Sequence, residues 1–168
     1  MKRLKSVCAV FSVLILSNWA VAAPPANFAG TWELDKAKSE GLQGRMADLN
    51  QTWTVTQDEK TLAVSIQLSG GAQEMPAQKY TYNLDGSETT AEVGGRMPGK
   101  ATMKAKWMGD GKILEINSVR NLNVQGNEVT ITTTEHWELA DGGKTLMVHR
   151  KSESPRGTQE SKLTLVKK

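Results

Sequence analysis

The stretch Glu135–Lys151, EHWELADGGKTLMVHRK, alternates apolar and polar residues on both sides of a Gly-Gly pair. Such alternation predicts two β-strands, and a Gly-Gly pair between them favours a tight hairpin turn. A turn at Gly142-Gly143 brings the apolar residues of the two strands opposite one another, which supports this register. The same register places Glu135 opposite Arg150 on the apolar face. The face expected to form core therefore carries two charges.

The rest of the chain repeats this pattern, because short alternating runs are separated by clusters of Gly, Asp, Asn and Pro at fairly regular spacing. This spacing is typical of an all-β sandwich or barrel. Residues 36–50 have weak helical character interrupted by two glycines, so they predict a crossing loop with a marginal helix at best. We predict about ten strands, near residues 29–35, 51–57, 61–68, 78–84, 87–93, 100–108, 112–124, 127–140, 144–153 and 159–166.

The first 22 residues have the features of a secretory signal peptide: a basic start (MKRLK), an apolar run (VCAVFSVLIL) and small residues (AVAA). Ala20 and Ala22 form an Ala-x-Ala match that predicts cleavage after Ala22. The apolar run is shorter than the roughly 18 to 20 residues that cross a bilayer, so we predict no transmembrane segment. We expect a barrel domain of residues 23–168 in the periplasm or outside the cell. Cys8 leaves with the signal peptide, so the mature domain must fold without a disulfide.

The charge of the mature chain argues against two classes of partner. The whole chain has 21 Lys and Arg against 18 Asp and Glu, a net charge of +3. Lys2, Arg3 and Lys5 lie in the predicted signal peptide, so the mature chain is balanced at 18 against 18. Binding to nucleic acid or to an anionic membrane needs a concentrated basic face. We therefore predict neither partner, and we expect a monomer.

Two further turns extend the face that carries the hairpin charges. A turn at Gly126-Asn127 predicts that Ser118 lies opposite Glu135, with Arg120 one step along on the same face. A turn at 110–111 predicts that the small or flexible residues of strand 100–108 lie opposite this part of strand 112–124. Three turns thus independently predict one inward face.

This inward face brings together Arg120, Glu135 and Arg150. A charge in an apolar interior costs several kcal/mol unless it is paired, hydrated or meets a ligand. Two arginines and one glutamate leave one positive charge, which a carboxylate, phosphate or other oxyanion would neutralise. The alternative is that water solvates the cluster at an open end of the barrel. We predict a binding cavity with these three residues at its polar end, lined further by Trp137, Trp107, Met103, Ala101, Ala105 and Ser118.

His136 and His149 are predicted cross-strand partners on the outward face, because the Gly-Gly register places them opposite each other. Two imidazoles at that distance could chelate Zn²⁺, Ni²⁺ or Cu²⁺, but a functional site needs a third ligand. We interpret the pair as solvated surface residues, and we expect neither a metal nor a cofactor.

Residues Asn27–Glu40, NFAGTWELDKAKSE, resemble the Gly-x-Trp first strand of lipocalin-like β-barrels, here Gly30-Thr31-Trp32. The turns DEKTL (58–62) and DGGKTL (141–146) are similar to those of small bacterial exported lipocalin-like (calycin-type) proteins of unknown function, and the resemblance covers most of the mature chain. It implies a single antiparallel up-and-down barrel of about 8 to 10 strands with an internal site for a small molecule. The last strand, SKLTLVKK, departs from this pattern, since it lacks the arginine that usually packs on the first-strand tryptophan.

These observations predict an exported binding protein that holds an amphiphilic or anionic ligand, such as a fatty acid, inside the barrel. One alternative is a small barrel enzyme. The mature chain has no cysteine nucleophile and no inward histidine in this register, so Glu135 would have to act alone as base. The other alternative is a structural or interaction protein of the cell envelope, which would have a filled core and a hydrophobic exterior patch.

Overall fold

A computed structural model describes residues 24–71, 75–93, 98–124 and 126–168. The predicted signal peptide, residues 1–22, lies outside the described residues. Regular alternation produces ten strands, as predicted, and the only helix within residues 36–50 is the four-residue α1 (Arg45–Asp48). The strands are β1 (Gly30–Leu34), β2 (Asn50–Gln57), β3 (Thr61–Ser69), β4 (Gln78–Asn83), β5 (Thr89–Val93), β6 (Gly99–Met108), β7 (Ile113–Val124), β8 (Asn127–Ala140), β9 (Thr145–Ser154) and β10 (Gly157–Lys167).

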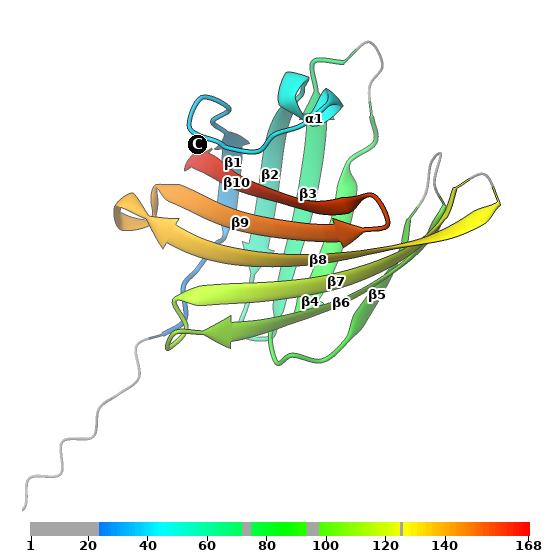
Figure 1. Cartoon of the computed structure of the whole chain (residues 1–168). Helices are drawn as coiled ribbons and strands as arrows, with labels where there is room; N and C mark the ends of the chain where they lie inside the picture. The colour runs from blue at the N-terminus through cyan, green and yellow to red at the C-terminus, as the bar shows by residue number, and fades with distance from the viewer. Residues whose placement is uncertain (1–23, 72–74, 94–97, 125) are drawn as a thin grey trace, which may run out of the picture.

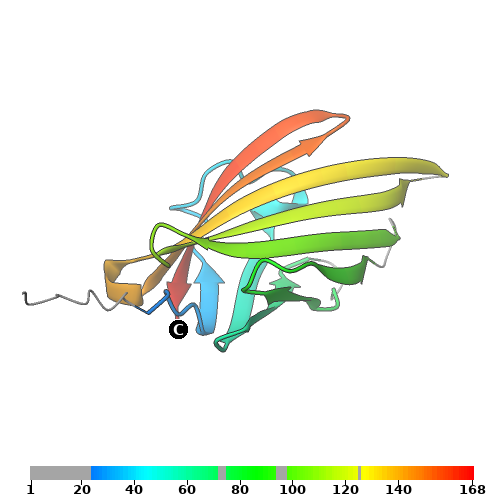
Figure 2. The ribbon, with the colours of Figure 1, turned by 90° about the horizontal axis from the view of Figure 1, so that it is seen from below.

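All ten strands belong to one antiparallel sheet, in the order β4-β3-β2-β1-β10-β9-β8-β7-β6-β5. The sheet curls so that β8, β9 and β10 run across β1, β2 and β3 at a steep angle (Figure 1). Figure 2 shows the long strands β6–β9 fanning out on one side of the interior. The two ends of the sheet, β4 and β5, approach each other, and the Thr89 hydroxyl donates to the Thr81 carbonyl over 2.9 Å. The predicted all-β up-and-down barrel is confirmed, as a nearly closed barrel.

The registers of the β8–β9 and β6–β7 hairpins agree with the sequence prediction. In β8–β9, Glu135 lies opposite Arg150 and His136 lies opposite His149. The loop between these strands is wider than two residues, because Ala140 and Thr145 form the last pair and the 3-10 turn η1 (Asp141–Gly143) lies between them. In β6–β7, Met103 lies opposite Ser118 and Ala101 opposite Arg120, as predicted.

The register of the β7–β8 hairpin differs from the prediction by two residues. Ser118 lies opposite Thr133, and Glu135 lies opposite Ile116. The turn is the reason: Val124 already pairs with Asn127, so the turn starts one residue earlier than predicted. A shift of two residues conserves the alternation of faces, because side chains on a strand alternate with a period of two. The inward face is therefore the predicted one.

The first strand is anchored by its tryptophan. Trp32 is fully buried, and its indole Nε1 donates to the Phe28 carbonyl over 2.9 Å. Where the resemblance leads one to expect an arginine, Lys167 of β10 places its ammonium 5.1 Å from the centroid of the Trp32 ring. Gly30 has a φ of 144°, and a Cβ at this position would lie 2.7 Å from the Lys167 side chain. The glycine therefore leaves the room that the lysine needs to cover the tryptophan.

The segment before β1 closes one end of the barrel. The Ala26 amide donates to the Gly111 carbonyl in the β6–β7 turn over 2.8 Å. Gln57, the last residue of β2, accepts from the Phe28 amide and donates to the Ala26 carbonyl, both over 2.9 Å. These bonds join the N-terminal segment to strands on both sides of the interior.

Phe28 fills the closed end from inside. Its side chain is fully buried, with its ring stacked on Trp107 at 5.8 Å and edge-on to Trp137 at 5.8 Å. Aromatic pairs of this kind add to the stabilisation that comes from burial alone. The remaining core surrounds this cluster, with Trp32, Trp53, Leu62, Ala105, Leu114, Leu146, Val148 and Leu165 all almost completely buried. No helix in the described ranges is long and apolar enough to span a membrane.

Candidate functional site

The barrel interior contains a cavity of about 340 Å³, lined by residues from β2, β3, β4, β7, β8, β9 and β10. Its lining combines an apolar and aromatic wall with many hydroxyl and amide groups. The apolar part includes Trp53, Val64, Ile66, Leu68, Ile131 and Trp137. The uncharged polar part includes Gln51, Gln78, Tyr80, Tyr82, Thr133, Ser152 and Gln159.

The three charged residues of the predicted inward face, Arg120, Glu135 and Arg150, all line this cavity. Arg150 Nε donates to Glu135 Oε1 over 2.7 Å, and Trp137 Nε1 donates to Glu135 Oε2 over 2.8 Å. Both carboxylate oxygens of Glu135 are therefore already engaged. The ion pair is largely shielded from solvent, since the Glu135 side chain is 14% exposed and the Arg150 side chain 28%. Such a pair is costly to break from one side, because the remaining charge stays buried.

Arg120 differs from Arg150 in having no carboxylate partner among the described residues. Its guanidinium carbon lies 5.8 Å from the centroid of the Tyr80 ring, at the distance of a cation–π contact. Its Nε is the only buried side-chain nitrogen or oxygen in the described part of the chain without a hydrogen-bond partner. A buried polar group of this kind costs about 1–3 kcal/mol. The excess positive charge predicted from the sequence thus belongs to Arg120.

All three charges of the cavity affect the pKa of Tyr82. Burial raises the pKa of the Tyr82 phenol well above its usual range, and Glu135 raises it further, while Arg120 and Arg150 oppose the rise. The phenol therefore stays neutral at physiological pH and adds no charge to the cavity. The charge balance of the cavity is set by the two arginines and Glu135 alone, with a net charge of one positive.

The structure places four of the nine predicted site residues in the cavity wall, namely Arg120, Glu135, Arg150 and Trp137. The other five lie on the same inward face but outside the lining of this cavity: Trp107, Met103, Ala101, Ala105 and Ser118. Near Trp107 the physical reason is Phe28, whose ring occupies the space beside this tryptophan. Small side chains on this face accommodate the protein's own core there.

The sequence interpretation missed the opposite wall of the cavity, which β2, β3 and β4 provide. Trp53, Tyr80 and Tyr82 belong to it. Their alternation within strands was visible, but the turns between these strands offered no register that would bring them to the charged face. Tyr80 and Tyr82 at alternate positions of one predicted strand, with Trp53 two strands away in the sheet, were the available signal.

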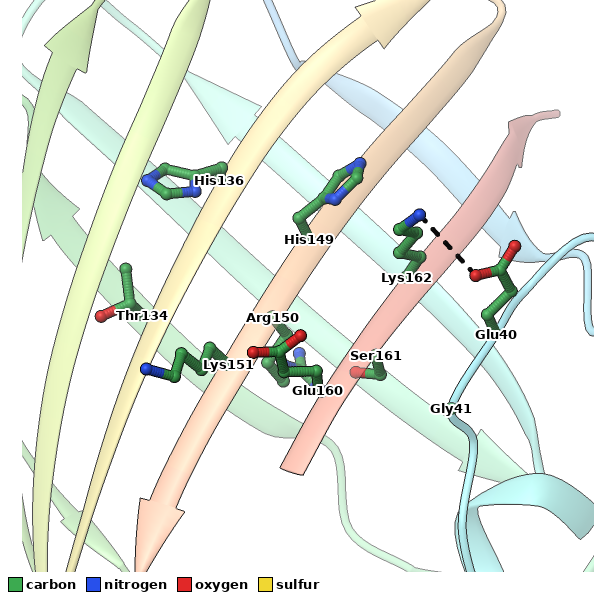
Figure 3. Close-up of a pocket in the computed structure, with 10 residues that line it drawn as sticks. All are labelled: Glu40, Gly41, Thr134, His136, His149, Arg150, Lys151, Glu160, Ser161 and Lys162. Atoms are coloured by element: carbon green, nitrogen blue, oxygen red, sulfur yellow. Dashed lines mark ion pairs between the residues drawn. The ribbon is translucent and has the colours of Figure 1, made fainter. Parts of the chain in front are cut away.

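A second hollow lies on the outer face of β8, β9 and β10, beside Glu40 and Gly41, with a volume of about 620 Å³ (Figure 3). His136, His149 and Lys162 follow one another across these strands as cross-strand partners. This groove is larger than the inner cavity, but it is open and its ammonium groups have nearby carboxylates. Lys162 Nζ lies 3.7 Å from Glu40 Oε2, and Lys151 Nζ lies 2.8 Å from Glu153 Oε1. The interior, with its unpartnered Arg120, is the stronger candidate site.

The histidine pair has the predicted cross-strand geometry. His136 Nε2 lies 3.1 Å from Glu115 Oε2, a contact that orients the imidazole. No cluster of three or more His, Cys, Asp or Glu side chains suited to a metal ion occurs in the described ranges. We expect Zn²⁺ to bind this pair with micromolar or weaker affinity, because two protein ligands leave the coordination sphere largely to water. Isothermal titration calorimetry measures this affinity, and a nanomolar site abolished in His149→Ala would refute it.

Glu115 of β7 links His136 of the histidine pair to Lys106 of β6. Lys106 Nζ lies 3.0 Å from Glu115 Oε1, and the bonds from Lys106, His136 and Asn117 lower the pKa of Glu115 to about 2. A lowered carboxyl pKa contributes stability above the unfolded-state pKa and loses it as the pH falls from about 4.5 to about 2. The Lys106 ammonium is well exposed, so the contribution is about 1 kcal/mol.

We therefore expect Glu115→Gln to lower the free energy of unfolding by about 1 kcal/mol near neutral pH, with the difference from wild type vanishing towards the acid limit. Urea denaturation over this pH range measures it. Glu88→Gln is the matched control, since Glu88 pairs with Lys104 at 3.7 Å with both side chains about half exposed. An unchanged or larger difference at low pH would contradict this assignment.

Comparison with known proteins places the fold in a class. No protein-family model and no curated protein matches the sequence. Among solved structures, the chain is similar to zebrafish ileal bile acid-binding protein complexed with cholic acid, with a TM-score of 0.56 and 14% identity over 84% of this chain and 98% of that one. It is also similar to the REP1-NXSQ fatty acid transporter (TM-score 0.52, 14% identity, 84% and 96% covered) and to human cRBP IV (TM-score 0.52, 14% identity, 86% and 100% covered). The chain thus shares the β-barrel fold of these proteins.

Proposed function

We propose that the protein binds a small anionic amphiphile inside its barrel. The observation that carries this proposal is the buried, unpartnered Nε of Arg120 in the wall of an interior cavity. A carboxylate would supply the missing acceptor and neutralise the charge that Glu135 leaves uncompensated. Charge-assisted hydrogen bonds between guanidinium and carboxylate are among the strong polar interactions in proteins.

The apolar wall supports the amphiphilic character of the ligand. Trp53, Trp137 and the aliphatic residues of β3 provide surface from which an apolar group would displace water. The structural neighbours named above support the proposal at the level of the fold, since one is complexed with cholic acid and another is a fatty acid transporter.

Two other functional classes receive less support. A barrel enzyme would need Glu135 as a base, but both its oxygens already accept hydrogen bonds from Arg150 and Trp137. An interaction protein would need a contiguous apolar patch. The large apolar residues exposed in the described part of the chain are Met108, Val119 and Val166, on three different strands.

The test is displacement of the neutral probe Nile red by decanoate and by decanol. The two ligands have chains of equal length and differ in charge, so the comparison isolates the contribution of the ligand's negative charge to binding. Decanoate is expected to displace the probe at the lower concentration, and equal displacement by both would overturn the proposal. Native mass spectrometry of protein purified from the cells that produce it provides an independent search for a bound ligand.

We also propose that the protein is exported, since residues 1–22 have the composition of a signal peptide. Intact-mass measurement of protein from producing cells is expected to show a chain that begins at Ala23. The mature protein is expected to fold without a metal or a disulfide. A retained N-terminus, or unfolding by a chelator, would contradict these expectations.

A further inference from the structure

We propose that the cavity accepts a compact, ring-bearing anion and excludes long-chain fatty acids. The reason is that a pair of tryptophans, Trp53 and Trp137, forms the floor of the cavity, and that the protein's own N-terminal segment packs against this pair. This inference rests on the proposed function and narrows its ligand class. It follows from three features: the construction of the floor, the filling of the barrel behind it, and the chemistry of the walls.

The floor consists of Trp53 and Trp137, whose rings lie 5.3 Å apart and are inclined by 43°. Both residues line the cavity, and each is about 1% exposed. Polar bonds hold both indoles in place. Trp137 Nε1 donates to Glu135, and Trp53 Nε1 donates to Gln51 Oε1 over 3.2 Å. A ligand entering the cavity thus meets two fixed aromatic rings.

The space behind the floor is filled. Phe28 is not among the lining residues; it packs edge-on against Trp137 and is fully buried. The segment that carries Phe28 is bonded to Gln57 and to the β6–β7 turn. Well-packed interiors do not yield space for extra methylene groups without strain. A ligand therefore cannot extend past Trp137 into the space that Phe28 fills.

The size and the walls of the cavity favour a ring over a chain. Its volume of about 340 Å³ is near the lower end of the roughly 300–1,000 Å³ found for ligand pockets. Tyr80 and Tyr82 contribute a second pair of stacked rings, with centroids 6.4 Å apart. Aromatic faces bind a flat ring through offset or edge-on packing.

The first test uses the wild-type protein and calorimetry with hexanoate, decanoate, palmitate and 2-naphthoate. Each methylene that becomes buried would raise the affinity roughly fourfold. We expect the affinity to stop rising before palmitate, and 2-naphthoate to bind at least about tenfold more tightly than palmitate. Affinity that keeps rising through palmitate would overturn the inference.

The second test removes part of the floor. In Trp137→Leu the affinity for palmitate is expected to rise about tenfold, which corresponds to about two newly buried methylenes. The matched control is Trp32→Leu, the same change at a tryptophan that is equally buried but outside the cavity lining; it is expected to leave the order of affinities unchanged. Unchanged palmitate affinity in Trp137→Leu would overturn the role of the floor, and if that variant does not fold, the wild-type series decides.

Failure of this inference differs from failure of the proposed function. If long chains bind as tightly as compact rings, and both depend on Arg120, the barrel binds anions without the size limit. If no carboxylate binds, or if Arg120→Ala leaves binding unchanged, the proposed function itself is wrong.

Discussion

Arg120→Ala is expected to weaken the binding of decanoate by about 1.5–3 kcal/mol, or roughly 10- to 150-fold. The reason is the position of this guanidinium: it lines the cavity, it has a buried unpartnered Nε, and no carboxylate of the described residues pairs with it. Removal of the side chain removes the donor that the anion would use, while the Arg150–Glu135 pair stays in place. Calorimetry with decanoate and with decanol measures the effect, and only the anion should respond.

Two variants separate this effect from a general change of charge. Arg156→Ala removes a positive charge at the exposed β9–β10 turn and is expected to leave decanoate binding unchanged. Glu135→Gln removes the internal counter-ion and is expected to leave anion binding equal or tighter. If Arg120→Ala and Arg156→Ala have the same small effect, the anion does not bind at Arg120.

The residues of the charged inward face could be predicted because two features constrain them: the hairpin turns set the register of each strand pair, and side-chain alternation sets the face. The hairpin containing Glu135 and Arg150 has the predicted pairs, although its turn is wider than predicted. The β7–β8 hairpin was predicted two residues out of register, yet Arg120 still faces inward. An error of two residues conserves the face, whereas an error of one would have turned every side chain outward.

The extent of the cavity could not be predicted in the same way, because it depends on a residue outside the strands. Phe28 precedes β1 in an irregular segment, where no alternation assigns it a face. Its burial depends on the bonds of its backbone with Gln57, which lies far away in sequence. Small residues such as Ala105 therefore indicated open space on the inward face, where the folded chain packs its own aromatic cluster.

Phe28→Ala is expected to lower the free energy of unfolding by about 3–5 kcal/mol, the range for removing a phenylalanine from a packed core. The effect should lie in this range because the ring is fully buried between Trp107 and Trp137 and little can collapse into its place. The backbone bonds of this segment do not involve the ring, so the variant tests packing and not the hydrogen bonds to Gln57. Chemical denaturation followed by tryptophan fluorescence and by circular dichroism measures the change. Val166→Ala, at a side chain 39% exposed, is the control and should change stability by no more than about 0.5 kcal/mol. A loss below about 1 kcal/mol in Phe28→Ala would mean that the N-terminal segment does not close the barrel in solution.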